Sequence, residues 1–145
     1  MSAFFLGLVA ALATTAADRA AIFNAAGFAP SAGKYLMCDR RTPLGLETRD
    51  FNGDKQLDAL VIDGGLECYG STESGFVLLT RSGSGSGKWT RLYGGSGVPR
   101  FLSTRANGWP DLEVGGPGFC FPILRWTGKE YANHRREYQG KPCRR

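Results

Sequence analysis

Oxygen-bearing side chains are regularly spaced in one short polar stretch in the first half of the chain. They occupy positions one, three, five and nine of that stretch, as Asp50, Asn52, Asp54 and Asp58. Alternating oxygens along a tight loop suit a hard cation, and the apolar residues 59–62 that follow suit a buried strand. The stretch therefore predicts a cation-binding loop that leads into a strand. The alternative is a turn whose carboxylates accept hydrogen bonds from backbone N–H groups.

A shorter version of this pattern stands at residues 107–116, where Asn107 and Asp111 again precede apolar residues. Aligning it with the first copy gives two tandem units, at about 47–93 and 104–134. Self-similarity on this scale is typical of stacked β-units. We therefore expect a compact antiparallel β-domain built from two repeat units. The second copy keeps too few oxygens for us to expect a metal ion there.

The stretch that begins at Asp50 resembles the Asp-x-Asn-Gly-Asp-x-x-x-Asp loop of FG-GAP and VCBS-type repeats, over residues 49–65. In that family the loop holds calcium, and small exported bacterial proteins often carry one or two such units. The family usually has glycine where Lys55 stands, at a position that favours a positive φ. The resemblance implies a Ca²⁺ ligand set of four side chains and one backbone carbonyl, from Asp50, Asn52, Asp54, Asp58 and, for the carbonyl, Gln56.

Few residues of the chain suit catalysis. His134 is the only imidazole, and it stands beside Arg135 and Arg136, which disfavour its protonated form. The sequence also lacks a phosphate-binding loop and a serine-centred nucleophile elbow. We therefore expect no enzymatic activity.

Aromatic residues are the remaining candidates for ligand contacts, because their rings can stack on sugars or single-stranded bases. Most of them fall within apolar runs and are expected in the core. Tyr69 and Trp109 stand next to turn signals. We expect these two to be exposed contact residues.

The elements that position these residues are predicted to be mainly strands. Glycine makes up 21 of the 145 residues and separates short apolar runs, as in β-folds with many tight turns. Strands are expected at 34–38, 57–62, 75–80 and 88–93, with a flexible hairpin loop at 81–87.

One short helix is expected at the start of the domain, over residues 18–26. Asp18 would cap it, Gly27 would end it, and Ile22 and Phe23 would face the core. The prediction is thus a mainly β domain over residues 18–145 with one N-terminal helix.

The first 17 residues are expected to be a signal peptide, because an apolar run is followed by small residues up to Ala17. The run is too short for a membrane anchor, so we expect no transmembrane segment after cleavage. The alternative is an uncleaved N-terminal helix. Export favours two disulfides among the four cysteines. Three connectivities are open, and closure of each repeat by its own flank favours pairing Cys38 with Cys68 and Cys120 with Cys143.

Positive charge is the last feature that bears on partners. The formal net charge is +5, and the excess is concentrated from residue 125 onwards. Such a tail suits acidic surfaces, although a solvated face that keeps an exported domain soluble is the favoured interpretation. Specific nucleic-acid binding is not expected, since the tail has no regular basic stripe.

Together these features predict a monomeric, periplasmic or secreted binding module, stabilised by calcium and without enzymatic activity. Its expected partner is an envelope polymer or another exported protein. The alternative function is inhibition of an envelope hydrolase of the lysozyme type. In that case the rigid disulfide-flanked loop at 115–120 would be presented to the active site.

Overall fold

Two antiparallel sheets form most of the molecule, which we describe from a computed structural model over residues 14–81 and 87–145. The first sheet contains β1 (Gly45–Arg49), β2 (Asp58–Gly64), β3 (Ser74–Arg81) and β4 (Trp89–Ser96). The second contains β5 (Val98–Ala106), β6 (Trp109–Gly115), β7 (Phe121–Trp126), β8 (Tyr131–Tyr138) and β9 (Lys141–Pro142). The described chain also contains α1 (Ala16–Ala25), α2 (Leu66–Tyr69) and the 3-10 turn η1 (Gly70–Thr72). The expected mainly β fold with an N-terminal helix is confirmed.

Each sheet is a meander in which neighbours along the chain are neighbours in the sheet. All pairings between the strands are antiparallel, and bulges interrupt β3–β4 at Leu78/Leu79 and β7–β8 at Ile123/Leu124. Short connections between antiparallel strands explain the frequent glycines. The predicted hairpin loop at 81–87 falls mostly on residues 82–86, which lie outside the described part of the chain.

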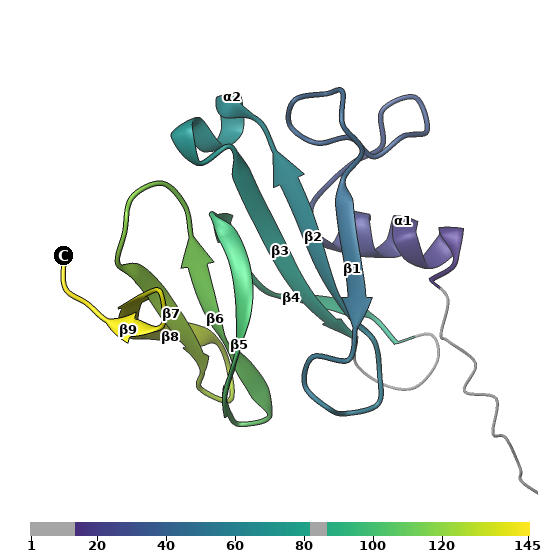
Figure 1. The fold of residues 1–145 in the computed structure, drawn as a ribbon. Helices are drawn as coiled ribbons and strands as arrows, with labels where there is room; N and C mark the ends of the chain where they lie inside the picture. Colours follow the sequence, from purple (N-terminus) through teal and green to yellow (C-terminus); the bar gives the residue numbers. More distant parts are fainter. Residues whose placement is uncertain (1–13, 82–86) are drawn as a thin grey trace, which may run out of the picture.

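The first sheet lies between α1 and the second sheet, as Figure 1 shows. Its strands β2 and β3 are therefore buried on both faces. Val61 and Leu79 join the core that contains Ile22 of α1, whereas Leu60 and Leu78 join the core shared with β6 and β7. Because successive side chains of a strand point to opposite faces, one continuous apolar run supplies both cores.

Helix α1 begins two residues earlier than the sequence predicts. Thr15 is its N-cap, and the Asp18 backbone N–H donates to Thr15 Oγ1 over 3.1 Å. The Asp18 carboxylate accepts in return from Thr15, so it completes a capping box rather than capping the helix itself. Ile22 and Phe23 are buried as expected. Of the predicted signal peptide, residues 1–13 lie outside the described part.

A single residue, Gly97, joins the two sheets. It has a φ of 134°, and a Cβ built on it would collide with Cγ1 of Val114 and lie 3.0 Å from the Gly115 carbonyl oxygen. The sheets thus divide the chain at Gly97, so the second sheet begins before the predicted second unit at 104 and continues beyond its end at 134. The duplication itself remains a prediction.

The strand expected at 34–38 is absent from the structure. This segment forms isolated bridges, including Leu36 with Pro43, instead of joining a sheet. The Asp39 carboxylate accepts the backbone N–H groups of Arg41 and Thr42, each over 2.8 Å. These local hydrogen bonds turn the chain back on itself, and β1 then begins at Gly45, where the sequence predicted no strand.

Two disulfides hold chain segments that the sheets alone would leave loose. Cys38 is bonded to Cys68, and Cys120 to Cys143, which is the connectivity favoured from the sequence. The first attaches segment 31–44 to α2, and the second attaches the chain end to the start of β7. Neither α1 nor α2 is long and apolar enough to cross a membrane.

Candidate functional site

The polar loop at residues 50–57 connects β1 to β2. The first sheet places its two ends side by side, because Arg49 pairs with Asp58 in the register of β1 and β2. Asp50, Asp54 and Asp58 each direct one carboxylate oxygen to a common point, and these three oxygens lie within 4.8 Å of one another. Three of the five predicted calcium ligands are therefore gathered in one place.

Backbone N–H groups already bond to the outer carboxylates of this loop. Asp50 Oδ1 accepts from Gly53 over 2.8 Å, and Asp50 Oδ2 accepts from Lys55 over 2.8 Å. Asp54 Oδ1 accepts from the N–H of Gln56 over 2.8 Å. This is the hydrogen-bonded turn that the sequence offered as the alternative. It does not compete with a cation, since each carboxylate oxygen has room for more than one contact.

The two remaining predicted ligands are held in the same loop. The Asn52 side chain is bonded to Asp54, with its Oδ1 accepting from the Asp54 N–H over 3.2 Å. Gln56 is fixed by its own backbone bond to Asp54. Both residues belong to the loop around the carboxylates, but neither is part of the carboxylate cluster itself.

Asp58 is the buried member of the cluster, with no exposed surface. Its Oδ1 accepts from Thr80 Oγ1 over 2.7 Å, and its Oδ2 accepts from the Phe51 N–H over 2.9 Å. Burial raises the pKa of Asp58 to about 6; these two hydrogen bonds oppose the rise, and the charges of Asp54 and Asp50 add to it. Among the ion pairs of residues 14–81 and 87–145, none involves a carboxylate of this cluster.

The donor set fits a calcium ion in its chemistry, since it offers only hard oxygen ligands. Two backbone positions in the loop are left-handed: Gly53 has a φ of 75° and Lys55 a φ of 69°. Glycine adopts this conformation without strain, but lysine does not. The left-handed conformation of Lys55 therefore carries a cost that glycine at this position would avoid.

The loop also packs against the second sheet. The Phe51 side chain is 4% exposed and lies in the core between the sheets, 4.5 Å from Phe101 between ring centroids. Arg105 Nη2 donates to the Phe51 carbonyl oxygen over 2.9 Å and to the Gly108 carbonyl oxygen over 2.7 Å. The conformation of the loop is thus coupled to the contact between the two sheets.

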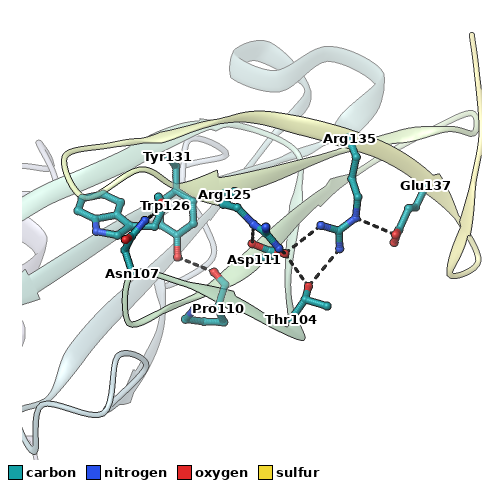
Figure 2. Close-up of polar contacts among 9 residues, drawn as sticks. All are labelled: Thr104, Asn107, Pro110, Asp111, Arg125, Trp126, Tyr131, Arg135 and Glu137. Atoms are coloured by element: carbon teal, nitrogen blue, oxygen red, sulfur yellow. Dashed lines mark hydrogen bonds and ion pairs between the residues drawn. The ribbon is translucent and has the colours of Figure 1, made fainter.

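Asp111 occupies the aligned position in β6, but its surroundings are different (Figure 2). Arg125 donates to it over 3.0 and 2.8 Å in a bidentate pair, and Arg135 Nη1 donates over 2.9 Å. Thr104 Oγ1 adds a bond of 2.6 Å. Arginine guanidinium groups therefore supply the positive charge that this buried carboxylate needs.

The charge balance at Asp111 changes its titration. Burial alone would raise the pKa of Asp111, but hydrogen bonds from Arg125, Thr104 and Arg135 outweigh burial and hold the pKa well below its usual value. The pKa values of Asp58 and Asp111 thus shift in opposite directions: burial raises both, but only Asp111 has cationic hydrogen-bond donors that outweigh it.

The prediction that Trp109 is an exposed contact residue is wrong. Its side chain is 5% exposed and packs in the core between the sheets, near the rings of Trp126 and Tyr131. Asn107 and Gly108 form a two-residue hairpin turn with positive φ values of 51° and 87°. The turn is so tight that Trp109 already belongs to β6 and faces inward.

Tyr69 is half-buried rather than free for a partner. Its hydroxyl donates to Asp63 Oδ2 over 2.6 Å, and burial, with help from this bond, raises its pKa to about 12. The ring lies over Gly75, where no Cβ would fit. Tyr69 therefore holds α2 against β3.

Exposed aromatic surface is found instead at residues that the sequence analysis did not select. Phe119 is 55% exposed, precedes Cys120, and lies 6.2 Å from Tyr138 between ring centroids. Phe121 lies 5.8 Å from the same ring. For Phe119 the sequence did carry a usable signal of exposure, because the residue stands between a glycine and a disulfide cysteine.

Residues around Asp111 were also missed. The available signal was the small number of acidic residues in segment 107–116, followed by Arg125 and Arg135, which could neutralise Asp111. Comparison of the chain with family models, with curated proteins and with solved structures finds no match.

Proposed function

We propose that the protein is an exported, non-catalytic binding module whose first sheet is stabilised by a calcium ion. The observation that carries this proposal is the contrast between the aligned aspartates. Asp111 is surrounded by two arginines, whereas Asp58 shares its position with Asp50 and Asp54 and has no ion pair within the described residues. Three carboxylates this close repel one another, and a divalent cation removes that cost.

The same contrast supports a duplicated origin for the two sheets. In the first, a metal ion would neutralise the buried aspartate; in the second, side chains of the neighbouring strands do so. Asp50, Asp54 and Asp58 would hold the ion, which would supply charge compensation and keep the loop ordered. Through Phe51 this order extends to the core between the sheets.

Export is supported by the disulfides, which persist in oxidising compartments. An envelope polymer or another exported protein is the partner class that this location offers. A non-catalytic role agrees with the surroundings of Asp111 and Tyr69, where the polar groups are hydrogen-bonded within the protein itself.

Calcium titration of the purified protein tests the proposal. We expect a calorimetric heat for Ca²⁺, and at a concentration about 100 times the dissociation constant a melting temperature roughly 10 °C above that in chelator. Asp50→Asn should abolish both effects. The matched control is Asp39→Asn, because Asp39 also bonds two backbone N–H groups but belongs to no carboxylate cluster. Equal melting temperatures with calcium and with chelator would refute calcium stabilisation.

Inhibition of an envelope hydrolase is the second candidate function. The exposed Phe119 favours it, since this aromatic side chain is presented next to a disulfide. Rigid presentation reduces the entropy lost on binding. Assay of a lysozyme-type hydrolase with added protein tests it: wild type should lower turnover and Phe119→Ala should not. Unchanged turnover with wild type would remove this candidate.

A further inference from the structure

A strongly basic pocket lies at the outer edge of the second sheet, far from the carboxylate loop. Its volume is about 550 Å³, and its lining includes His134, Arg135, Arg136, Arg144 and Arg145. No aspartate or glutamate is among the residues that line it. Figure 1 shows the chain end at this edge, on the opposite side of the molecule from α1.

The fold holds the chain beside the pocket up to Cys143, and Arg144 and Arg145 beyond it are exposed to solvent. Strand β9 pairs with the end of β8, and the Cys143 N–H donates to the Arg136 carbonyl oxygen over 3.2 Å. The Cys120–Cys143 disulfide ties the same point to the start of β7. Arg144 and Arg145 follow directly, so their positions relative to the sheet are restricted.

Several of the cationic groups have hydrogen-bond donors to spare. Arg135 is committed to Asp111 and Glu137, and Arg136 uses Nη1 to bond the Cys120 carbonyl oxygen over 3.0 Å. For Arg144 and Arg145, no hydrogen bond or ion pair is formed with any described residue. Arg136, Arg144 and Arg145 have no ion pair with a described residue, so their like charges repel, and an anion that enters the pocket relieves that repulsion.

We propose that this pocket binds closely spaced oxyanions of an acidic polymer. Guanidinium groups bind carboxylate and phosphate in a bidentate manner, so several of them in one open pocket suit a chain with repeated anionic groups. The inference rests on the proposed function in one respect only, namely that the partner of the module is an envelope polymer. It assigns a different surface from the calcium loop.

Binding of the full-length oxidised protein to two acidic polymers tests the assignment. Polygalacturonate supplies carboxylates, polyphosphate supplies phosphates, and dextran is the neutral control. We expect binding to at least one acidic polymer, none to dextran, and weaker binding at high salt because salt screens exposed charges. The acidic polymer that binds with the lower dissociation constant then identifies whether the pocket prefers carboxylate or phosphate.

Two matched double variants locate the site. R144Q/R145Q should raise the dissociation constant about tenfold, whereas R40Q/R41Q, which removes the same charge from exposed arginines outside the pocket, should change it less than about twofold. Both pairs are exposed, so unchanged melting temperatures are expected for each variant. Equal weakening by the two variants, or no weakening by R144Q/R145Q, would overturn the pocket.

The outcomes separate the two proposals. Polymer binding that R144Q/R145Q leaves intact would refute the pocket but preserve the binding module. If neither acidic polymer binds, the pocket assignment is refuted, and an exported protein remains as the partner class. Tighter binding to single-stranded DNA than to both polymers would overturn the polymer assignment. A failed calcium titration would not affect the result for the pocket.

Discussion

At the scale of single residues, the two sheets surround a buried aspartate in different ways. Asp111 is surrounded by arginine side chains from β7 and β8, whereas Asp58 lies beside two further carboxylates. An isolated buried charge is costly, so each environment calls for a cation. The second sheet carries its cations in the chain, and we infer that the first takes one from solution.

Replacement of Asp111 tests how much the built-in cations contribute. Asp111→Asn should lower the free energy of unfolding by about 2 kcal/mol, less than is usual for a buried ion pair because both guanidinium groups keep some contact with water. Urea unfolding measures the change. Glu137→Gln, which removes a single partner of Arg135, should cost about 1 kcal/mol or less. Equal losses for the two variants would contradict this account.

The lowered pKa of Asp111 predicts how stability depends on pH. The pKa of this carboxyl is lower in the folded protein than in the unfolded chain, where aspartate has a pKa of about 3.9. Its contribution is therefore complete above about pH 5 and is lost as the pH falls through about 4 and below. The stability difference between wild type and Asp111→Asn should shrink over that range in urea unfolding at constant ionic strength. A difference that stayed constant down to about pH 2 would contradict the prediction.

At the scale of elements, the connection between β4 and β5 decides how the sheets meet. The chain leaves the first sheet at Ser96 and enters the second at Val98, with only Gly97 between them. The Gly97 N–H also donates to the Ser74 carbonyl oxygen over 2.9 Å. No other residue type fits both the backbone conformation and the close approach to β6.

Substitution of this glycine should therefore be costly. Gly97→Ala is expected to destabilise the protein by about 3 kcal/mol, since it combines left-handed strain with a collision against Val114. Gly95→Ala is the control, because a Cβ there would make only ordinary van der Waals contacts, the nearest at 3.8 Å. Thermal unfolding of both variants measures the difference. A Gly97→Ala protein as stable as the control would show that the sheets can shift apart without cost.

At the scale of the whole molecule, three layers share two cores and the disulfides hold the margins. Segment 31–44 makes only isolated bridges; Leu44, Tyr35 and Met37 pack on the core beside α1, and its other attachments are the Cys38–Cys68 bond and a few hydrogen bonds. One of these runs from the Cys38 N–H to Asp63 Oδ1 over 2.7 Å. The margin of the first sheet is therefore less firmly held than its centre.

Removal of that disulfide should show this difference. The C38A/C68A variant lacks the bond that joins residues 30 positions apart. Its unfolded chain is therefore less constrained, and we expect a loss of about 3 kcal/mol in the free energy of unfolding. In the native state, hydrogen exchange should accelerate in segment 31–44 and remain slow in β2 and β3. The control is the wild-type protein under oxidising conditions. Uniform acceleration across all strands would instead indicate that the bond supports the entire fold.

Local features of this protein were determined by the sequence alone. Three such features are the mainly β fold, the buried stripe of α1 and the carboxylate cluster at Asp50. Each arises from residues a few positions apart, and their spacing determines which side chains lie on the same face. The favoured cysteine pairing rested on the expectation that each repeat is closed by its own flank. The strand expected at 34–38 failed because the hydrogen bonds of Asp39 compete with strand pairing.

Only the tertiary structure decided which distant residues meet. Trp109 became a core residue because the hairpin turn is two residues long and the opposite sheet covers β6. Asp111 found Arg125 and Arg135, 14 and 24 residues further along, because the register of β6, β7 and β8 brings them together. The basic pocket exists because β9 pairs with β8 and a disulfide ties Cys143 to the start of β7. Such contacts depend on register and on the packing of whole faces, and a shift of one residue would reverse them.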